Sequence, residues 1–218
     1  MQIEEIPKDL LDQNNMKTLV CLTSGVESVS TLKWALENKR HVIASHSMMV
    51  DGTAWNENHF HWSIAERPRV QRICDNLGVP LLKKDFRSPT GKDAPRTKDK
   101  YWWLLGALEH TLWDLDINEI YYGANSGLIV KGDGFGDSYF AGCTNDIHSI
   151  TQIWGAAQNR DLSISSPLAY LSKKEHYLTI EKESEYLFSC WDPVKTLTGG
   201  YKPCGECPKC NELIEVKK

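Results

Sequence analysis

The sequence of 218 residues has no apolar run close to the ~20 residues that a membrane-spanning helix needs. It also lacks an excess of basic residues, because 25 lysines and arginines stand against 29 aspartates and glutamates, for a formal net charge of −4. Broad nucleic-acid binding relies on a positive surface, so a nucleic-acid partner is not expected. Internal repeats, low-complexity tracts and long linkers are absent as well. The sequence therefore favours a soluble protein with one sizeable core.

A secretory signal is also missing from the start of the chain. The first residues, MQIEEIPKDLLDQ, are acidic and polar, whereas a secretory signal has basic residues followed by an apolar stretch. We therefore expect a cytoplasmic protein whose seven cysteines are reduced.

Four of these cysteines gather near the C-terminus and predict a metal site. Cys204, Cys207 and Cys210 follow a Cys-x-x-Cys-x-x-Cys rhythm, and Cys190 stands at the head of the segment. The short x-x turns let neighbouring sulfurs point inward together, which suits tetrahedral zinc. A disulfide would need an oxidising compartment, and an iron–sulfur or redox site is the remaining alternative. Four sulfur ligands leave no open position, so we expect this zinc to hold structure.

The remainder of the chain alternates short apolar runs with stretches of helical spacing. This alternation predicts an α/β fold, a parallel sheet with helices on both faces. We expect the helix that ends before Gly78 to be interrupted, or to begin, near Pro68. The expected strands are 16–23, 41–50, 79–86 and 119–122, and the expected helices are 26–39, 59–77 and 98–115. Ligands of such sheets bind beyond the carboxyl ends of the strands, which directs attention to three loops.

The first loop, Ser24-Gly25-Val26-Glu27-Ser28, joins the first strand to its helix. Its N–H groups lie at a helix N-terminus with hydroxyls beside them, an arrangement that stabilises a phosphate or pyrophosphate. The alternative is a capping box, since Ser24 and Glu27 have the Ser-x-x-Glu spacing that satisfies such amides without a ligand. The spacing leaves both interpretations open.

The second loop follows the fourth strand, and the third precedes a later helix. The second runs from Gly123 through a glycine-rich stretch to Gly136, and we expect it to cover a substrate; calcium at Asp133 and Asp137 is the weaker alternative. In the third, Ser172 and Glu175 have capping-box spacing, which places Lys173 in the first turn of a helix. A cation is unfavourable there, so either an anion lies nearby or the lysine is solvated.

Four segments, in this order between Val20 and Cys210, resemble the 7-cyano-7-deazaguanine synthase (QueC) family of the PP-loop ATP pyrophosphatase superfamily. They are LTSGVESVSTL, IYYGAN, SPLAYLSKKE and the ending SCW…CGECPKC. The resemblance implies an adenine nucleotide alpha hydrolase-like domain over residues 1–188. It also implies a zinc-binding C-terminal segment, residues 189–218, packed on the same domain.

The resemblance also implies an activity and its residues. Members of this family use ATP and Mg²⁺ to convert 7-carboxy-7-deazaguanine and ammonia, through an adenylated intermediate, to the nitrile by way of the amide. The loop of Ser24, Gly25, Val26, Glu27 and Ser28 would surround the ATP phosphates, with Lys173 and Ser28 as catalytic groups. Cys190, Cys204, Cys207 and Cys210 would be the zinc ligands, and the protein would be a homodimer.

The chain departs from the family pattern at several positions. Val26 stands where the family has a second glycine, and Ser28 stands at or beside an acidic position. A valine restricts the backbone where close approach of a phosphate is expected. Other substrate-binding stretches are unmatched; residues near them that could substitute are His59, His61, Arg96, Lys98 and Lys100. Two functions therefore stay open, a divergent enzyme and a binding or scaffold protein of a phage or defence system with a degenerate ATP site.

Overall fold

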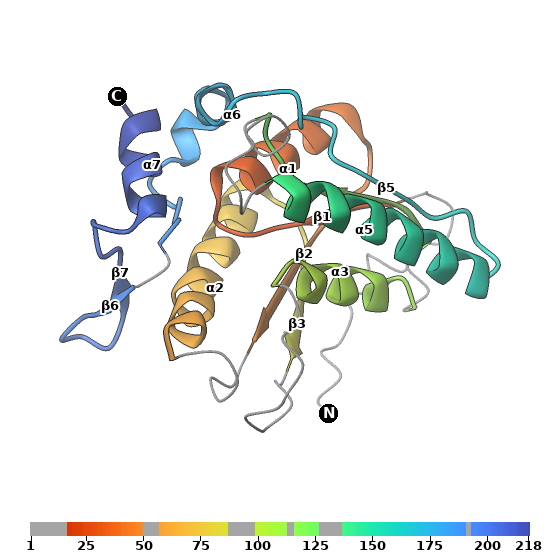
Figure 1. Ribbon diagram of the computed structural model, residues 1–218, viewed down its shortest axis with the longest axis horizontal. Helices are drawn as coiled ribbons and strands as arrows, with labels where there is room; N and C mark the ends of the chain where they lie inside the picture. Colours follow the sequence, from red (N-terminus) through yellow and green to blue (C-terminus); the bar gives the residue numbers. More distant parts are fainter. Residues whose placement is uncertain (1–16, 50–56, 87–98, 113–115, 127–136, 191–192) are drawn as a thin grey trace.

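The protein is built around a five-stranded sheet in which every strand is parallel to its neighbours (Figure 1). The computed structural model describes residues 17–49, 57–86, 99–112, 116–126, 137–190 and 193–218. The strand order is β3-β2-β1-β4-β5. The strands are β1 (Lys17–Cys21), β2 (Val42–Met49), β3 (Leu81–Phe86), β4 (Ile117–Tyr122) and β5 (Ser163–Ser165).

Helices cover both faces of the sheet. Side chains along a strand alternate between the two faces and so contribute to two separate cores. Along β1, Leu19 and Cys21 join one core, whereas Val20 and the following Leu22 join the other. Helices α3 (Asp99–His110) and α5 (Asp137–Ala157) pack on the first face. Helices α1 (Val26–Asn38) and α2 (Glu57–Leu77) cover the second. The predicted α/β class, a parallel sheet with helices on both faces, is confirmed.

Helix α2 continues through Pro68, so the predicted interruption is wrong. A proline inside a helix lacks one backbone hydrogen bond and costs about 3 kcal/mol. Pro68 is exposed, while Val70, Ile73 and Cys74 of the same helix are fully buried against the sheet. Burial of this apolar stripe offsets the cost of the proline. The helix ends as predicted before Gly78, whose φ of +66° is the left-handed conformation that suits glycine.

Two elements, helix α5 and strand β5, were not predicted from the sequence. Helix α5 buries Ile147 and Thr151, and β5 extends the sheet by pairing Ile164 with Ile120 of β4. Much of the predicted substrate-covering loop, including Asp133, lies outside the described residues, as do Arg96 and Lys98. The same holds for certain side chains within helices, namely those of His59, His61, Lys100 and Asp137.

The C-terminal part of the chain lies against the α1 and α2 face (Figure 1). Helix α6 (Lys173–Thr179) and a 3₁₀ turn (Glu181–Glu183) lead to the cysteines. The short strands β6 (Val194–Lys195) and β7 (Tyr201–Lys202) form an antiparallel pair, and α7 (Pro208–Val216) follows. Leu213 of α7 is buried in the same core as α1 and α2. We refer to residues 189–218 as the cysteine segment.

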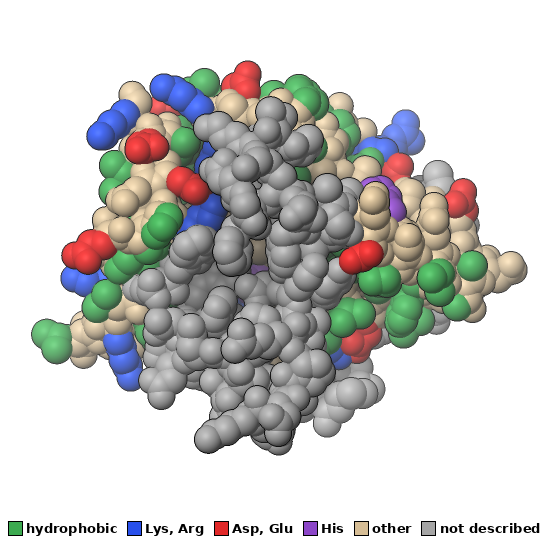
Figure 2. All heavy atoms as spheres, viewed as in Figure 1, with side chains coloured by type: hydrophobic (Ala, Val, Ile, Leu, Met, Phe, Trp, Pro, Cys, Tyr) green, Lys and Arg blue, Asp and Glu red, His purple; other side chains and the backbone are tan. Residues whose placement is uncertain are grey.

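The described surface carries charges of both signs. Where side chains are described on the face in Figure 2, lysines and arginines are interspersed with aspartates and glutamates. Among the described helices, none combines the length and the apolar character that crossing a membrane requires.

Candidate functional site

The candidate site lies between β1 and β4, where the order in which the chain adds strands to the sheet reverses. The chain builds β2 and β3 on one side of β1 and then crosses to place β4 on the other side. In open α/β sheets this switch point is where ligands bind, beyond the carboxyl ends of the strands. The loop that follows β4 touches the first turn of α1 there, because a Cβ atom added to Gly123 would lie 2.5 Å from the backbone nitrogen of Ser28. Two of the three predicted loops therefore meet at this point.

Helix α1 begins without a side-chain cap, so the capping-box interpretation of Ser24 and Glu27 is wrong. The N-cap residue is Gly25, in an extended conformation. Within the described part of the chain, the N–H groups of Val26, Glu27 and Ser28 have no hydrogen-bond acceptor. Free amides at the positive end of a 13-residue helix form a suitable place for an anion.

The hydroxyl groups of this loop are used to shape it. Ser28 Oγ accepts a hydrogen bond from the Thr23 N–H at 3.1 Å and lies 2.9 Å from Thr23 Oγ1. Ser24 is fully buried, and its hydroxyl faces the protein interior. Val26 is fully buried too, with its side chain in the core. The valine at the position of the family glycine therefore points away from the free amides and does not cover them.

A buried glutamate on α2 fixes the loop. Glu66 Oε1 accepts hydrogen bonds from the N–H of Ser24 at 2.8 Å and from its hydroxyl at 3.2 Å. Burial raises the pKa of Glu66 to about 7, although both bonds to Ser24 and the charge of Arg69 act in the opposite direction. Glu66 therefore changes its protonation near neutral pH while holding the backbone of the loop.

We expect Glu66→Gln to remove a pH dependence of stability. The pKa of Glu66 is 4.5 when unfolded and about 7 when folded, so below about pH 7 the folded protein keeps a proton that the unfolded chain releases. The free energy of unfolding of the wild type should thus fall as the pH rises from 5 to 8, by at most about 3 kcal/mol from this group. Glutamine accepts the same bonds without ionising. Urea unfolding of both proteins at pH 5 and pH 8 measures the difference; identical changes with pH would contradict it.

Lys173 lies beside the loop in a group of charged and polar side chains. Its Nζ is 2.7 Å from Glu212 Oε2 of α7 and 3.5 Å from Glu27 Oε1 of α1. Glu27 Oε1 also accepts a hydrogen bond from Asn125 Nδ2, at 2.6 Å, from the loop after β4. The predicted solvated lysine is wrong, since the Lys173 side chain is only 15% exposed. The anionic groups beside Lys173 are the carboxylates of Glu27 and Glu212.

These carboxylates keep Lys173 charged, and α6 keeps it in place. Burial alone would lower the pKa of Lys173, but Glu27 and Glu212 outweigh that effect and raise the pKa above its ordinary value. The predicted capping box is confirmed: Ser172 Oγ accepts from the Glu175 N–H, and Glu175 Oε2 accepts from the Ser172 N–H. The capping box thus fixes the backbone of Lys173, which is the first residue of α6.

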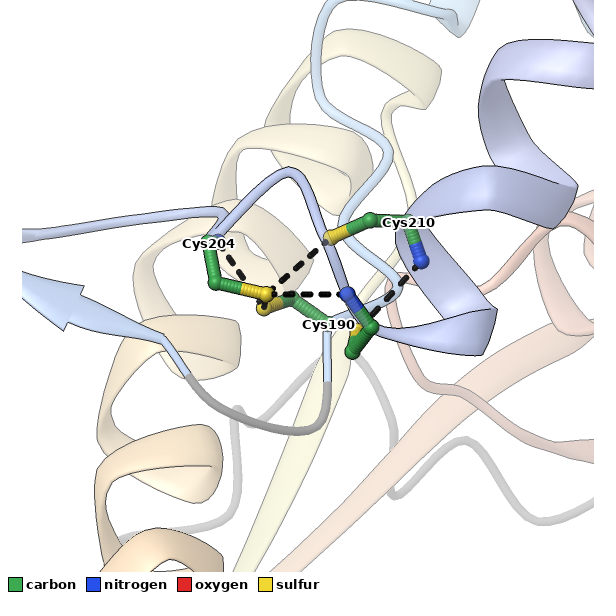
Figure 3. A group of neighbouring side chains, drawn as sticks. Cys190, Cys204 and Cys210 are labelled. Carbon is green, nitrogen blue, oxygen red and sulfur yellow. Dashed lines mark hydrogen bonds between the residues drawn. The ribbon is translucent and has the colours of Figure 1, made fainter.

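The four predicted cysteine ligands converge at one point. Their Sγ atoms all lie within 4.8 Å of one another, with Cys190 to Cys204 at 3.6 Å and Cys204 to Cys210 at 3.8 Å (Figure 3). Backbone N–H groups point at the sulfurs. The N–H of Cys204 donates to Cys190 Sγ at 3.2 Å, and that of Cys207 donates to Cys204 Sγ at 3.3 Å. Such donors stabilise thiolate charge.

This geometry fits a single tetrahedral ion. With metal–sulfur bonds of about 2.3 Å, the sulfurs of a tetrahedral site are ~3.8 Å apart, close to the observed separations. The sulfurs are too far apart for a disulfide bond, which is about 2.05 Å long. A cluster of several iron and sulfide atoms would need the four sulfurs to lie further apart. The cysteine segment can therefore hold one metal ion by four sulfur ligands.

Two residues of this region were missed in the sequence. Glu66 begins the stripe Glu66, Val70, Ile73 on α2, whose spacing marks the buried face of a helix, so an acidic residue there is a readable signal. Glu212 lies 39 residues beyond Lys173, and no local pattern indicates that the two meet.

The fold and site together define a parallel α/β protein with free helix amides at its switch point and a separate cluster of four cysteines that could bind a metal ion. No family model matches the chain. The 7-cyano-7-deazaguanine synthase of Alteromonas mediterranea is 23% identical over an alignment 226 positions long, which covers 92% of this chain and 93% of that enzyme. This similarity confirms the resemblance inferred from the four ordered segments.

Two solved structures give weaker matches. The U34-tRNA thiolase NcsA from Methanococcus maripaludis, solved with its [4Fe-4S] cluster, is 13% identical with a TM-score of 0.45, over 96% of this chain and 67% of that one. A 4-thiouridine synthetase, solved with RNA and bound ATP, is 14% identical with a TM-score of 0.47, over 93% of this chain and 50% of that one.

Proposed function

We propose that this chain is an ATP-dependent enzyme that converts 7-carboxy-7-deazaguanine and ammonia to 7-cyano-7-deazaguanine or to the amide that precedes it. The observation that carries the proposal is the start of α1, where three amides without an acceptor in the described chain lie beside Lys173 at the switch point. The similarity to a 7-cyano-7-deazaguanine synthase over 92% of the chain supplies the reaction.

The proposed chemistry needs phosphate stabilisation and no protein nucleophile. A carboxylate oxygen of the substrate attacks the α-phosphorus of ATP, and pyrophosphate leaves. Ammonia then displaces AMP and loses a proton, which gives the amide. For the nitrile, the amide oxygen attacks the α-phosphorus of a second ATP and pyrophosphate leaves; loss of AMP and two protons then gives the nitrile. Helix amides and a cation favour both steps because they stabilise the negative charge of the leaving pyrophosphate.

We assign roles to the predicted residues on this basis. The amides of Val26, Glu27 and Ser28 bind phosphate oxygens, with Mg²⁺ accompanying the ATP. Lys173 is the proposed catalytic cation, and Ser28 and Ser24 shape the loop through their hydroxyls. The proposed metal in the cysteine segment is zinc, because a closed site of four sulfurs is typical of structural zinc. We also propose that the protein is cytoplasmic and forms a homodimer.

The activity is tested with ATP, Mg²⁺, ammonium and 7-carboxy-7-deazaguanine. We expect AMP and a product with the mass of the amide or nitrile. Lys173→Ala should lower the rate about 10²-fold to 10³-fold, since a cation that stabilises leaving-group charge is lost. Lys174→Ala is the matched control, because its neighbouring side chain is exposed, and it should retain the wild-type rate. Calorimetry that detects no ATP binding at millimolar concentration would contradict the proposal.

A second candidate is a binding or scaffold protein that keeps the fold without the reaction. It is favoured by one observation, that Lys173 is already paired with Glu27 and Glu212 and so is not free for a phosphate. This candidate predicts that the deazaguanine acid raises the melting temperature of the protein whether or not ATP is present, and that no AMP forms. The two candidates are separated by the AMP measurement.

A further inference from the structure

The cysteine segment is joined to the loop at the start of α1 through backbone contacts of Phe188. Phe188 lies two residues before Cys190. Its N–H donates to the Ser24 carbonyl at 2.9 Å, and the Ser24 hydroxyl lies 3.2 Å from the Phe188 carbonyl. Both residues are almost completely buried, so these bonds are shielded from water. A displacement of Phe188 would therefore displace the loop.

A second connection starts on the other side of the cysteines. Glu212 lies two residues after Cys210, on α7. It pairs with Lys173 at 2.7 Å, and Lys173 reaches Glu27 of the loop at 3.5 Å. Glu212 is also paired with Lys209 at 2.9 Å, which fixes its position within α7. The residues that flank the four cysteines are thus connected to opposite ends of the same loop: Phe188 contacts Ser24, and Glu212 is linked to Glu27 through Lys173.

Immediately around the four cysteines, the described residues supply few packing contacts. Among the described residues, the small core around the cysteines consists of Ala65, Phe188 and Tyr201 besides the four ligands. Arg69 of α2 lies over the Phe188 ring at 4.2 Å and donates to the Tyr201 carbonyl at 3.2 Å. Next to these contacts is a pocket of about 390 Å³ between α2 and the turn before β7. Packing alone therefore holds the chain around the cysteines weakly, whereas α7 is anchored by Leu213 in the core with α1 and α2.

We propose that the metal held by the four cysteines positions the nucleotide loop, with Phe188 and Glu212 as the positioning residues that connect them. When the sulfurs are held together, Phe188 fixes the carbonyl and hydroxyl of Ser24, and Glu212 fixes Lys173 against Glu27. When the metal is removed, both connections loosen, and the amides at the start of α1 lose their common orientation. The inference rests on the proposed function only in assigning this loop to ATP.

The first test compares metal-loaded protein with protein depleted by a chelator and then reloaded with Zn²⁺. We expect amide hydrogen exchange of residues 22–29 and of Phe188 to become roughly tenfold faster on depletion and to recover on reloading. Exchange in the strands β1, β2 and β4 should stay slow, which shows that the sheet remains folded. Equal exchange of residues 22–29 in both forms would overturn the proposal.

Calorimetry with ATP and Mg²⁺ provides the second measurement. The dissociation constant should rise about tenfold on depletion. If even the metal-loaded protein binds no ATP, the proposed function fails, while the exchange measurement still decides whether the metal positions the loop.

A pair of variants tests Glu212 without touching a ligand. Glu212→Gln and Glu215→Gln each remove one carboxylate from α7, but Glu215 is exposed and forms no described ion pair. Both variants should retain the metal. Only Glu212→Gln should accelerate exchange of residues 22–29, by about threefold or more, because Lys173 loses the negative charge of its closer partner. Matching exchange rates in the two variants would contradict the proposal.

Discussion

Replacing Cys207 with alanine is expected to release the bound metal and to lower the free energy of unfolding by on the order of 4 kcal/mol. Cys207 has two roles in the structure. Its sulfur is one of the four that converge, and it also caps α7 by accepting a hydrogen bond from the Cys210 N–H at 3.4 Å. The substitution therefore removes a ligand and the start of a helix together. Metal content by mass spectrometry and urea unfolding of the metal-loaded proteins measure both effects.

Cys74→Ala is the matched control for this experiment. Cys74 is also a fully buried cysteine, but it lies on α2 in the core with Val70 and Ile73. Its replacement should cost about 1 to 2 kcal/mol in lost packing and leave one metal ion per chain. A full metal complement in Cys207→Ala would contradict the ligand assignment.

Replacing Gly123 with alanine is expected to lower the free energy of unfolding by about 3 kcal/mol and to abolish ATP binding. The added Cβ would lie 2.5 Å from the backbone carbon of Glu27 and 2.5 Å from the backbone nitrogen of Ser28. Backbone atoms at the start of a helix cannot rotate away as the end of a side chain can. Helix α1 must therefore move relative to β4, and its free amides move with it. Thermal unfolding and ATP calorimetry report the two effects.

The control for Gly123→Ala is Gly200→Ala, in the cysteine segment. A Cβ at Gly200 would meet Thr196 Oγ1 at 3.5 Å, an ordinary contact, and its φ is not in the left-handed region. Stability should change by less than about 0.5 kcal/mol, and ATP binding should be unchanged. If Gly123→Ala behaved like this control, the packing of α1 beside β4 would not depend on the close approach of Gly123 to the backbone of Glu27 and Ser28.

The sheet was predictable because its strands read as short apolar runs, and the central strand β1 is buried on both faces. The expected strand 16–23 becomes β1 (Lys17–Cys21), and the expected strand 79–86 becomes β3 (Leu81–Phe86). The four cysteines were predictable because their spacing is local. Helix α5 was also predictable, because Ile147, Ile150 and Trp154 have the spacing of one face of a helix. It was not predicted because the glycine-rich stretch before it indicated a loop.

The electrostatics of the site could not be predicted, since they depend on residues far apart in the chain. Lys173 suggested a nearby anion through its place in a helix turn, yet nothing local identified Glu212 as the partner. The orientation of Val26 also depends on the fold: the sequence indicated a valine that restricts the backbone, but only the fold shows that its side chain is buried in the core. The burial of Glu66 was readable in the apolar stripe of α2, but its partner Ser24 was not, because Ser24 lies 42 residues earlier.

The pairing of Ser24 with Phe188 has a consequence for protein synthesis. These residues are 164 positions apart, so the loop near the start of the chain reaches its final geometry only after almost all of the chain has been made. A ribosome-bound chain that ends before Phe188 can form the pairing of β1 with β2, but Ser24 would lack this backbone partner. If the loop binds a nucleotide as proposed, we expect binding only after Phe188 has been made and has paired with Ser24.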